Sequence, residues 1–182
     1  MTGNLVGNER YLFDTNILIN AKNNYYHPDI VPAFWQWVMD GHKQGCFYSI
    51  DKVSNELKKG DETDYLQQFA LNHQSMFLSS NDISCIAEYA KLQTWVNTVW
   101  TQKKNLNKTS KAIEVFASET NADAFLVAYA KAHSFIIVTN ETSDLQCQTN
   151  VKIPDAANYC GVEVINLYQL LLAHSHNNFQ FK

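Results

Sequence analysis

Short runs of apolar residues alternate along the chain with longer amphipathic segments. The runs predict β-strands over residues 10–13, 46–50, 135–138 and 162–165, with a short edge strand over residues 75–80. Apolar residues at helical spacing predict helices over residues 28–45, 51–60, 81–100 and 121–133. Because strands alternate with helices, the pattern favours an α/β fold with a parallel sheet covered by helices.

The predicted helices carry end signals and apolar faces. Asp51 and Asn121 are good N-terminal caps, and the helix that starts at Asp51 is expected to end at Gly60. The face of the segment 81–100 that is expected to be buried carries Ile83, Ile86, Ala90 and Trp95. The face expected to be buried in the last of these helices carries Phe125, Ala128, Tyr129 and Ala132.

Composition limits the class of protein. With 182 residues, of which 46% are hydrophobic, the chain is expected to form one domain over residues 1–182 with a sizeable core. Its apolar runs are far shorter than the roughly 20 residues of a membrane span, and its first residues do not resemble a secretion signal. The four cysteines form no C-x-x-C pair, which favours reduced thiols. A cytoplasmic protein is expected.

The charge of the chain narrows its chemistry. A net charge of −4 argues against a protein that holds nucleic acid mainly by bulk electrostatic attraction, although local contacts remain compatible with it. Arg10 is the only arginine, so a catalytic arginine clamp is excluded unless a partner supplies one. Carboxylates, lysines and a metal ion remain as candidates.

Four acidic residues follow predicted strand ends or open the next helix. Asp14 ends the first strand, and Glu56 lies on the helix after the second. Asp123 lies in the first turn of the helix capped by Asn121, and Glu141 follows the strand 135–138. Ligand sites of open parallel sheets form beyond the carboxyl ends of the strands, so we expect these acids to converge.

A cluster of carboxylates has a definite chemical preference. Like charges repel unless they share protons or bind a cation, and oxygen ligands suit Mg²⁺ or Mn²⁺. Such ions can activate water and stabilise the leaving oxygen of a phosphodiester. Taken singly, each acid also has an ordinary structural role, as a helix cap, a partner of the helix dipole or a solvated surface group. Together they indicate a metal-dependent phosphodiesterase.

Four short segments, "FDTNILI", "NEL", "ADAFLVAYA" and "IIVTNE", occur in an order and spacing that resemble the PIN-domain nucleases. The similarity extends from Tyr11 to about Leu170 and is greatest to the bacterial branch that includes the VapC-type toxins. The resemblance implies a three-layer α/β/α fold with a sheet of four or five strands in the order 3-2-1-4-5. It also implies an Mg²⁺- or Mn²⁺-dependent ribonuclease, neutralised by a cognate antitoxin and frequently a homodimer.

The resemblance assigns roles to particular residues. Asp14 and Asn16 match the D-x-N motif, and Glu56 and Asp123 match the second and third acids. The fourth acid lies two residues after a Thr or Ser, which makes Thr139 a supporting residue and Glu141 the match. Glu141 is longer than the more usual aspartate, and Asp144 lies close enough in sequence to take its place.

Two further features are open to more than one interpretation. The segment 83–118 is longer than in minimal PIN domains, and either adds a packing layer or shapes substrate or partner binding. The substrate contacts nominated from the lysines are Lys58, Lys59, Lys103, Lys104, Lys108 and Lys111. Runs of charge are more often a solvated face than a binding surface.

Two other functions compete with the nuclease. A haloacid-dehalogenase-like phosphatase also begins from an aspartate after the first strand, but it needs a second aspartate where this chain has Asn16. A catalytically silent α/β module that binds RNA or protein is the alternative from a different class. An activity assay of the wild type and an Asp14 variant with Mn²⁺ separates this module from a nuclease.

Overall fold

The central sheet is parallel throughout. A computed structural model describes residues 9–101, 111–144, 147 and 149–182. In that part of the chain five strands are ordered β3-β2-β1-β4-β5. Their bounds are β1 Tyr11–Phe13, β2 Phe47–Ile50, β3 Phe77–Leu78, β4 Ile136–Val138 and β5 Val164–Ile165. Each lies inside a predicted run, and the predicted order and parallel direction are confirmed.

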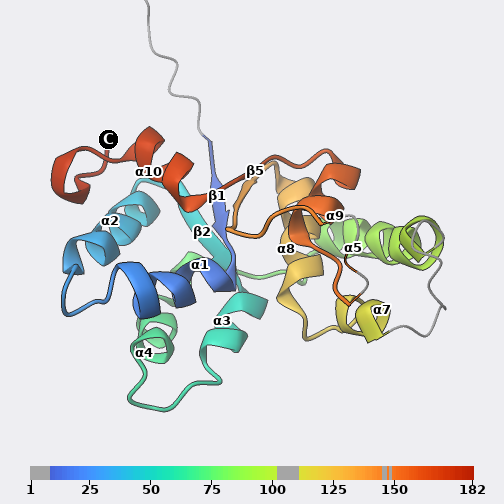
Figure 1. Cartoon of the computed structure of the whole chain (residues 1–182), viewed down its shortest axis with the longest axis horizontal. Helices are drawn as coiled ribbons and strands as arrows, with labels where there is room; N and C mark the ends of the chain where they lie inside the picture. Colours follow the sequence, from blue (N-terminus) through green and yellow to red (C-terminus); the bar gives the residue numbers. More distant parts are fainter. Residues whose placement is uncertain (1–8, 102–110, 145–146, 148) are drawn as a thin grey trace, which may run out of the picture.

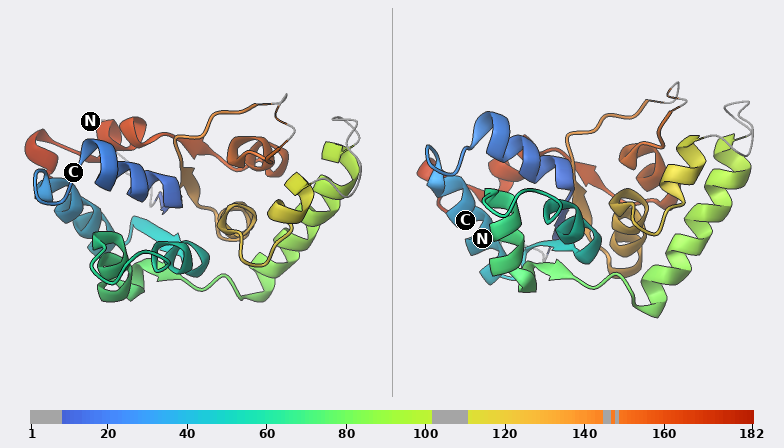
Figure 2. Two further views of the ribbon diagram at one scale, coloured as in Figure 1. Left: turned by 60° about the horizontal axis from the view of Figure 1, so that its bottom comes forward. Right: turned by 90° about the horizontal axis from the view of Figure 1, so that it is seen from below.

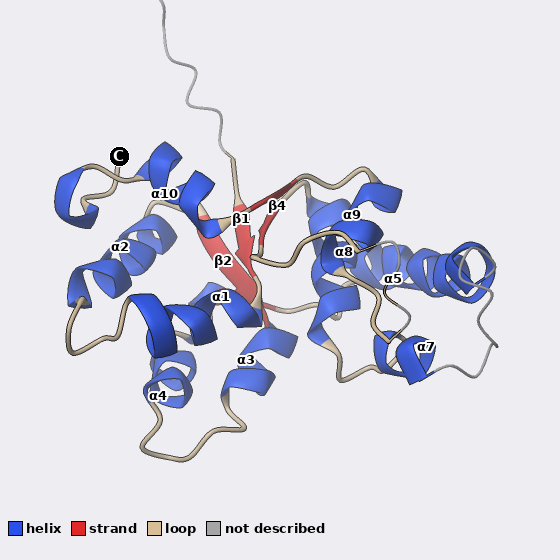
Figure 3. Ribbon diagram, viewed as in Figure 1, coloured by secondary structure: helices blue, strands red, loops and turns tan. Residues whose placement is uncertain are grey.

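Helices cover both faces of this sheet, which confirms the three-layer architecture. In Figures 1 and 3, α1, α2, α4 and α10 lie on one side of the strands, and α5, α7, α8 and α9 lie on the other. Their bounds are α1 Thr15–Asn20, α2 Pro32–Lys43, α4 Tyr65–Asn72, α5 Ile83–Trp95, α7 Lys111–Phe116, α8 Ala122–His133, α9 Ile153–Cys160 and α10 Leu167–His174. None of the described helices is long and apolar enough to cross a membrane.

The carboxyl edge of the sheet collects several chain segments. β1 runs downwards in Figure 1, and α1 follows at its lower end. The helix α3 (Asp51–Leu57) and the beginning of α8 lie at the same edge. Tyr11, Leu12 and Phe13 are all buried, as expected for the central strand. This edge therefore receives the residues that follow β1, β2 and β4.

Several predicted helix ends are shifted in the structure. The helix predicted over residues 28–45 begins at Pro32, because proline is favoured in the first turn, where its missing N–H costs no hydrogen bond. Asp51 is the first helical residue and not the cap, and it accepts a hydrogen bond from Ser80 Oγ instead. The same helix ends at Leu57, before Gly60. Asn121 does cap α8, with its side chain accepting from the backbone N–H of Asp123.

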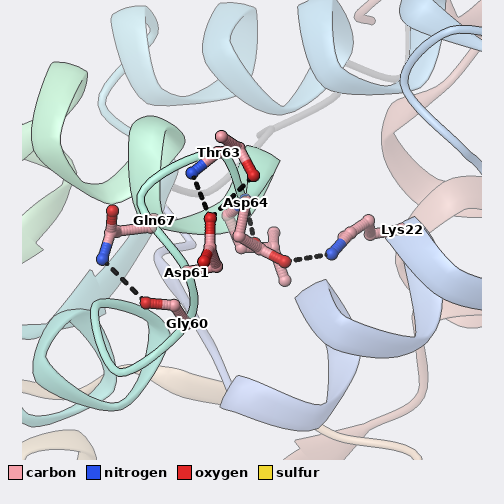
Figure 4. Close-up of polar contacts among 7 residues, drawn as sticks. Lys22, Gly60, Asp61, Thr63, Asp64 and Gln67 are labelled. Atoms are coloured by element: carbon pink, nitrogen blue, oxygen red, sulfur yellow. Dashed lines mark hydrogen bonds and ion pairs between the residues drawn. The ribbon is translucent and has the colours of Figure 1, made fainter.

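The loop between α3 and α4 is held by its own side chains (Figure 4). Asp61 Oδ1 accepts hydrogen bonds from the backbone N and the Oγ1 of Thr63 at 2.9 and 2.7 Å. Asp64 caps α4 through the backbone N–H of Leu66 and also pairs with Lys22. Lys22 belongs to the π-helical segment η1 (Ala21–Tyr25) that continues α1. This contact ties the start of α4 to the helical segment that follows Asp14.

The long segment after β3 packs on the outer side of α8 (Figure 2). It contains α5, the π-helical turn η3 (Val96–Trp100) and, after residues 102–110, which lie outside the description, α7. The predicted buried face was wrong at three of its four residues, since Ile83 and Ile86 are 88% and 49% exposed and Ala90 is exposed, while Trp95 is buried as predicted. The side chains that face the core are those of Cys85, Leu92, Trp95 and Val96. On α8, Phe125, Ala128 and Tyr129 are buried as predicted, while Ala132 is only partly buried.

Candidate active site

Asp14 is a buried carboxylate at the end of the central strand. It is 1% exposed, and its backbone N–H donates to the carbonyl of Val138 at 3.0 Å, which extends the β1–β4 ladder by one residue. Thr139 Oγ1 donates to Asp14 Oδ2 at 2.8 Å. Burial raises the pKa of Asp14 to about 6, and the charges of Glu141 and Glu56 act in the same direction, against the hydrogen bond from Thr139.

Asp123 is placed opposite Asp14 by the first turn of α8. Its backbone N–H donates to Asn121 Oδ1 at 2.7 Å, which fixes the start of the helix. Burial raises the pKa of Asp123 to about 7, and the largest charge effect after burial comes from Asp14. Glu141 and Glu56 raise it further, and Lys152 lowers it. The four predicted acids therefore share one electrostatic neighbourhood.

Glu56 links the start of α1 to the start of α8. Its Oε2 accepts from Thr15 Oγ1 at 2.5 Å, and its Oε1 accepts from the backbone N–H of Ala122 at 3.3 Å. Thr15 follows Asp14 directly, and Ala122 precedes Asp123. Glu56 thus holds the two segments that carry the buried aspartates.

Glu141 is engaged by a cation that the sequence analysis did not nominate. Lys152 Nζ donates to Glu141 Oε1 at 3.2 Å, and the backbone N–H of Ile153 donates to Oε2 at 3.0 Å. The Glu141 N–H itself donates to Thr139 Oγ1 at 3.1 Å, so Thr139 supports two acids. Lys152 lies eleven residues after Glu141 in a loop, with no strand or helix pattern to mark it. Only the fold brings this cation to the acids.

A cavity of about 250 Å³ opens beside these carboxylates. Asp123 and Glu141 line it together with Asn16, which is exposed, and Asn121. Side chains of α7 close its other side. The segment before α8 therefore bounds the site, in addition to packing against α8.

The remaining predicted residues lie at the surface or outside the described chain. Asp144 is exposed, whereas Glu141 raises the pKa of both Asp14 and Asp123, so Glu141 is the fourth acid of the cluster. Lys59 and Lys111 are exposed and Lys58 is partly so. Lys103, Lys104 and Lys108 lie outside the described residues.

The donor chemistry suits a hard divalent cation. Among the described residues, no three side chains of His, Cys, Asp or Glu form a group arranged to hold a metal ion. Glu56 and Glu141 are turned to protein donors, and Asp14 exerts the largest charge effect on the pKa of Asp123, so Asp14 and Asp123 are the candidate pair of ligands. Mg²⁺ typically uses one or two carboxylates together with water and substrate phosphate, so such a pair is sufficient. The prediction that all four acids are ligands stays a prediction.

Comparison with known families identifies the sequence class. The family model described as "Domain of unknown function (DUF4411)" matches residues 11–179. The chain is a member of the DUF4411 family. No curated protein sequence matches this DUF4411 chain significantly.

Comparison with solved structures confirms the fold of the DUF4411 chain. It is similar to VapBC2 from Rickettsia felis, solved bound to a DNA fragment from its promoter, with a TM-score of 0.50 and 20% identity. The match covers 86% of this chain and 97% of the other. The predicted VapC-like PIN fold is therefore confirmed, and at this identity the likeness concerns the fold alone.

Proposed function

We propose that this DUF4411 protein is a divalent-metal-dependent endoribonuclease that leaves 5′-phosphate ends. The observation that carries the proposal is the convergence of four acids at one edge of the sheet: Glu56 joins the segments of Asp14 and Asp123 through Thr15 and Ala122, and Asp123 and Glu141 line one cavity. Burial and the charges of the other acids raise the pKa of both aspartates, which agrees with this arrangement. These acids come from separate elements: the end of β1, α3, the first turn of α8 and the segment after β4. Their convergence is costly for folding unless a cation offsets it.

The residues of the chain would divide the work. Asp14 and Asp123 would hold a Mg²⁺ or Mn²⁺ ion, and Thr139 would keep the Asp14 carboxylate in place through its hydrogen bond. Glu56 would fix the separation of the two aspartates through Thr15 and Ala122. Lys152 would hold Glu141 and reduce the negative charge that a phosphodiester meets. When bound, a divalent ion supplies activation of water and charge neutralisation at the phosphate group.

The nuclease is tested by neutral substitutions. Asp14→Asn and Asp123→Asn preserve shape and remove charge, so each should lower Mn²⁺-dependent cleavage of a mixed RNA by at least about 100-fold, measured from initial rates. Asp29→Asn is the matched control, because Asp29 is 89% exposed in the loop before α2. Circular dichroism checks that every variant folds. Cleavage that persists in EDTA, or in both site variants, would refute the proposal.

Substrate and partner contacts extend the proposal. Lys58, Lys59, Lys103 and Lys104 are the proposed contacts to the RNA backbone. The family resemblance and the VapBC2-like fold support a small antitoxin partner and a homodimer. Light scattering of the chain alone tests the homodimer, and a monomeric mass would oppose it. Light scattering and an activity assay in the presence of the product of an adjacent reading frame test the antitoxin, and an unchanged mass and activity would oppose it.

A further inference from the structure

A second cavity, of about 560 Å³, lies beyond the carboxyl ends of β4 and β5. Thr139 and Glu141 line it, and Glu141 also lines the cavity beside the aspartates. The residue between them, Asn140, turns toward α10, where its Oδ1 accepts from the backbone N–H of Leu167 at 3.4 Å. Glu141 is therefore shared by the two cavities, and Thr139, which binds Asp14, lines the second one.

Three side-chain amides in this cavity have fixed orientations. Besides Asn140, Asn166 Oδ1 accepts from the backbone N–H of Gln169 at 2.8 Å, and Gln169 Oε1 accepts from that of Asn166 at 2.9 Å. In each amide the oxygen accepts a hydrogen bond from a backbone N–H, and the NH₂ group can donate to a different acceptor. Within the described residues, none of the three NH₂ groups donates to a protein acceptor. The cavity offers donors to a ligand.

The rest of the lining suits a flat, uncharged ring. Val164, Ile165 and Pro154 supply apolar surface, and Tyr168 is 68% exposed at the rim. Among the described residues the lining includes neither Lys nor Arg and does include Glu141, so a phosphate group is disfavoured there. Exposed aromatic rings bind nucleobases by stacking. Amide NH₂ groups favour bases that present carbonyl oxygens.

We propose that this cavity is a subsite for a uracil or guanine base of the RNA strand, next to the phosphodiester that is cut. Tyr168 stacks on the base, and the NH₂ groups of Asn140 and Gln169 donate to its carbonyl oxygens. The inference rests on the proposed nuclease and adds to it the class of base that selects the cleavage position. A base that carries an amino group in place of a carbonyl oxygen would place a hydrogen-bond donor against the NH₂ donors of Asn140 and Gln169.

Cleavage positions in an RNA of random sequence test the subsite. With Mn²⁺, the wild type should show uracil or guanine enriched at one position beside the cut. Asn140→Asp and Gln169→Glu keep the oxygen that the backbone N–H needs and replace the NH₂ group by an oxygen. Each should reduce the ratio of uracil plus guanine to cytosine plus adenine at that position by roughly tenfold. Asn158→Asp adds the same charge on the exposed part of α9 and should leave the ratio unchanged.

Tyr168 provides a second, independent readout. Tyr168→Ala should lower kcat/KM on every sequence by roughly tenfold, because stacking is sequence-tolerant, and Tyr168→Phe should restore it. A wild-type base preference that survives both amide variants, together with an unchanged rate for Tyr168→Ala, would overturn the subsite while leaving the nuclease intact. If the wild type cuts no RNA, the nuclease itself fails. Fluorescence polarisation then decides the subsite, and equal affinity for U₆ and C₆ overturns it.

Discussion

At the scale of single residues, the main feature of the site is the negative charge of four neighbouring acids. Asp14 is almost completely buried, yet one hydrogen bond from Thr139 is the main side-chain contact that favours its ionised form. The pKa of Asp123 is raised further than that of Asp14, first by burial and then by the charges of three other acids. Glu141 is balanced by Lys152. Among the described residues, Glu141 is therefore the one acid of the four that forms an ion pair, and the carboxylates of Asp14 and Glu56 meet neutral donors only.

This charge predicts a pH dependence of stability in EDTA. The pKa of Asp123 is about 7 in the folded protein and 3.8 for the ordinary group. Below pH 3.8 the carboxyl group is protonated in both states and carries no penalty. The penalty grows as the pH rises toward 7 and is complete above it, since ionisation is then opposed only in the folded state. Asp123→Asn should therefore exceed the wild type in unfolding free energy by about 2–4 kcal/mol at pH 8.

Urea unfolding at a series of pH values measures that difference. The advantage of Asp123→Asn should vanish near pH 4, and Asp29→Asn should track the wild type at each pH. A variant that is destabilised at pH 8 would show that the Asp123 carboxylate is a structural ligand of the fold instead.

At the scale of elements, short connections place the acids with little freedom. Asp14 lies between β1 and α1, and Thr139 and Glu141 follow β4. The helix α2 packs closely on β2, because Gly41 in α2 lets the ring of Phe47 approach its backbone. Phe47 in turn contacts Phe13, the residue before Asp14, with ring centroids 5.4 Å apart. The packing of α2 on Phe47, and of Phe47 on Phe13, therefore supports β1, the strand that ends at the site.

Gly41→Ala tests this packing. A methyl group at residue 41 would overlap the Phe47 ring, so we expect a loss of about 1–3 kcal/mol, typical of overpacking, despite the better helix propensity of alanine. Urea unfolding measures the loss. In a Phe47→Leu background the smaller side chain should remove most of the cost, which a double-mutant cycle detects. Additive effects of the two substitutions would contradict the proposed overlap.

At the scale of the whole molecule, the parallel order β3-β2-β1-β4-β5 gathers the acids at one edge. The helix layer of α5, α8 and α9 supplies Asp123, and α3 supplies Glu56. If a cation relieves their repulsion, binding must stabilise the entire fold, because only the folded chain brings the four acids together.

Mn²⁺ should therefore raise the melting temperature. At about 100 times its dissociation constant a ligand adds roughly 2.7 kcal/mol. For a chain of this length each kcal/mol corresponds to about 2–4 °C, so the expected increase is roughly 5–10 °C by differential scanning calorimetry. Asp123→Asn should melt above the wild type in EDTA and gain less from Mn²⁺. A wild-type transition that Mn²⁺ leaves in place would argue against the metal site.

Local sequence determined the strands, the helices that carry Glu56 and Asp123, and the position of each acid along the chain. Short apolar runs between the amphipathic segments predicted the five strands, because a strand that is buried on both faces of a sheet needs a continuous apolar segment. Asn121 determined the start of α8, since a cap acts on the N–H groups next to it. Asp14 was recognisable because it ends a buried strand. The four segments that resemble PIN domains added the strand order.

Only the tertiary structure decided what these residues contact. Ile83 and Ile86 are exposed, which shows that helical spacing predicts an apolar face of a helix but not whether another element packs against it. The pairing of Glu56 with Thr15 joins positions 41 residues apart, and that of Lys152 with Glu141 joins a loop to a strand end. The amides of Asn140 and Gln169 meet in one cavity for the same reason. Such contacts depend on how strands and helices pack across the sheet, and periodicity along the chain carries no information about distances through space.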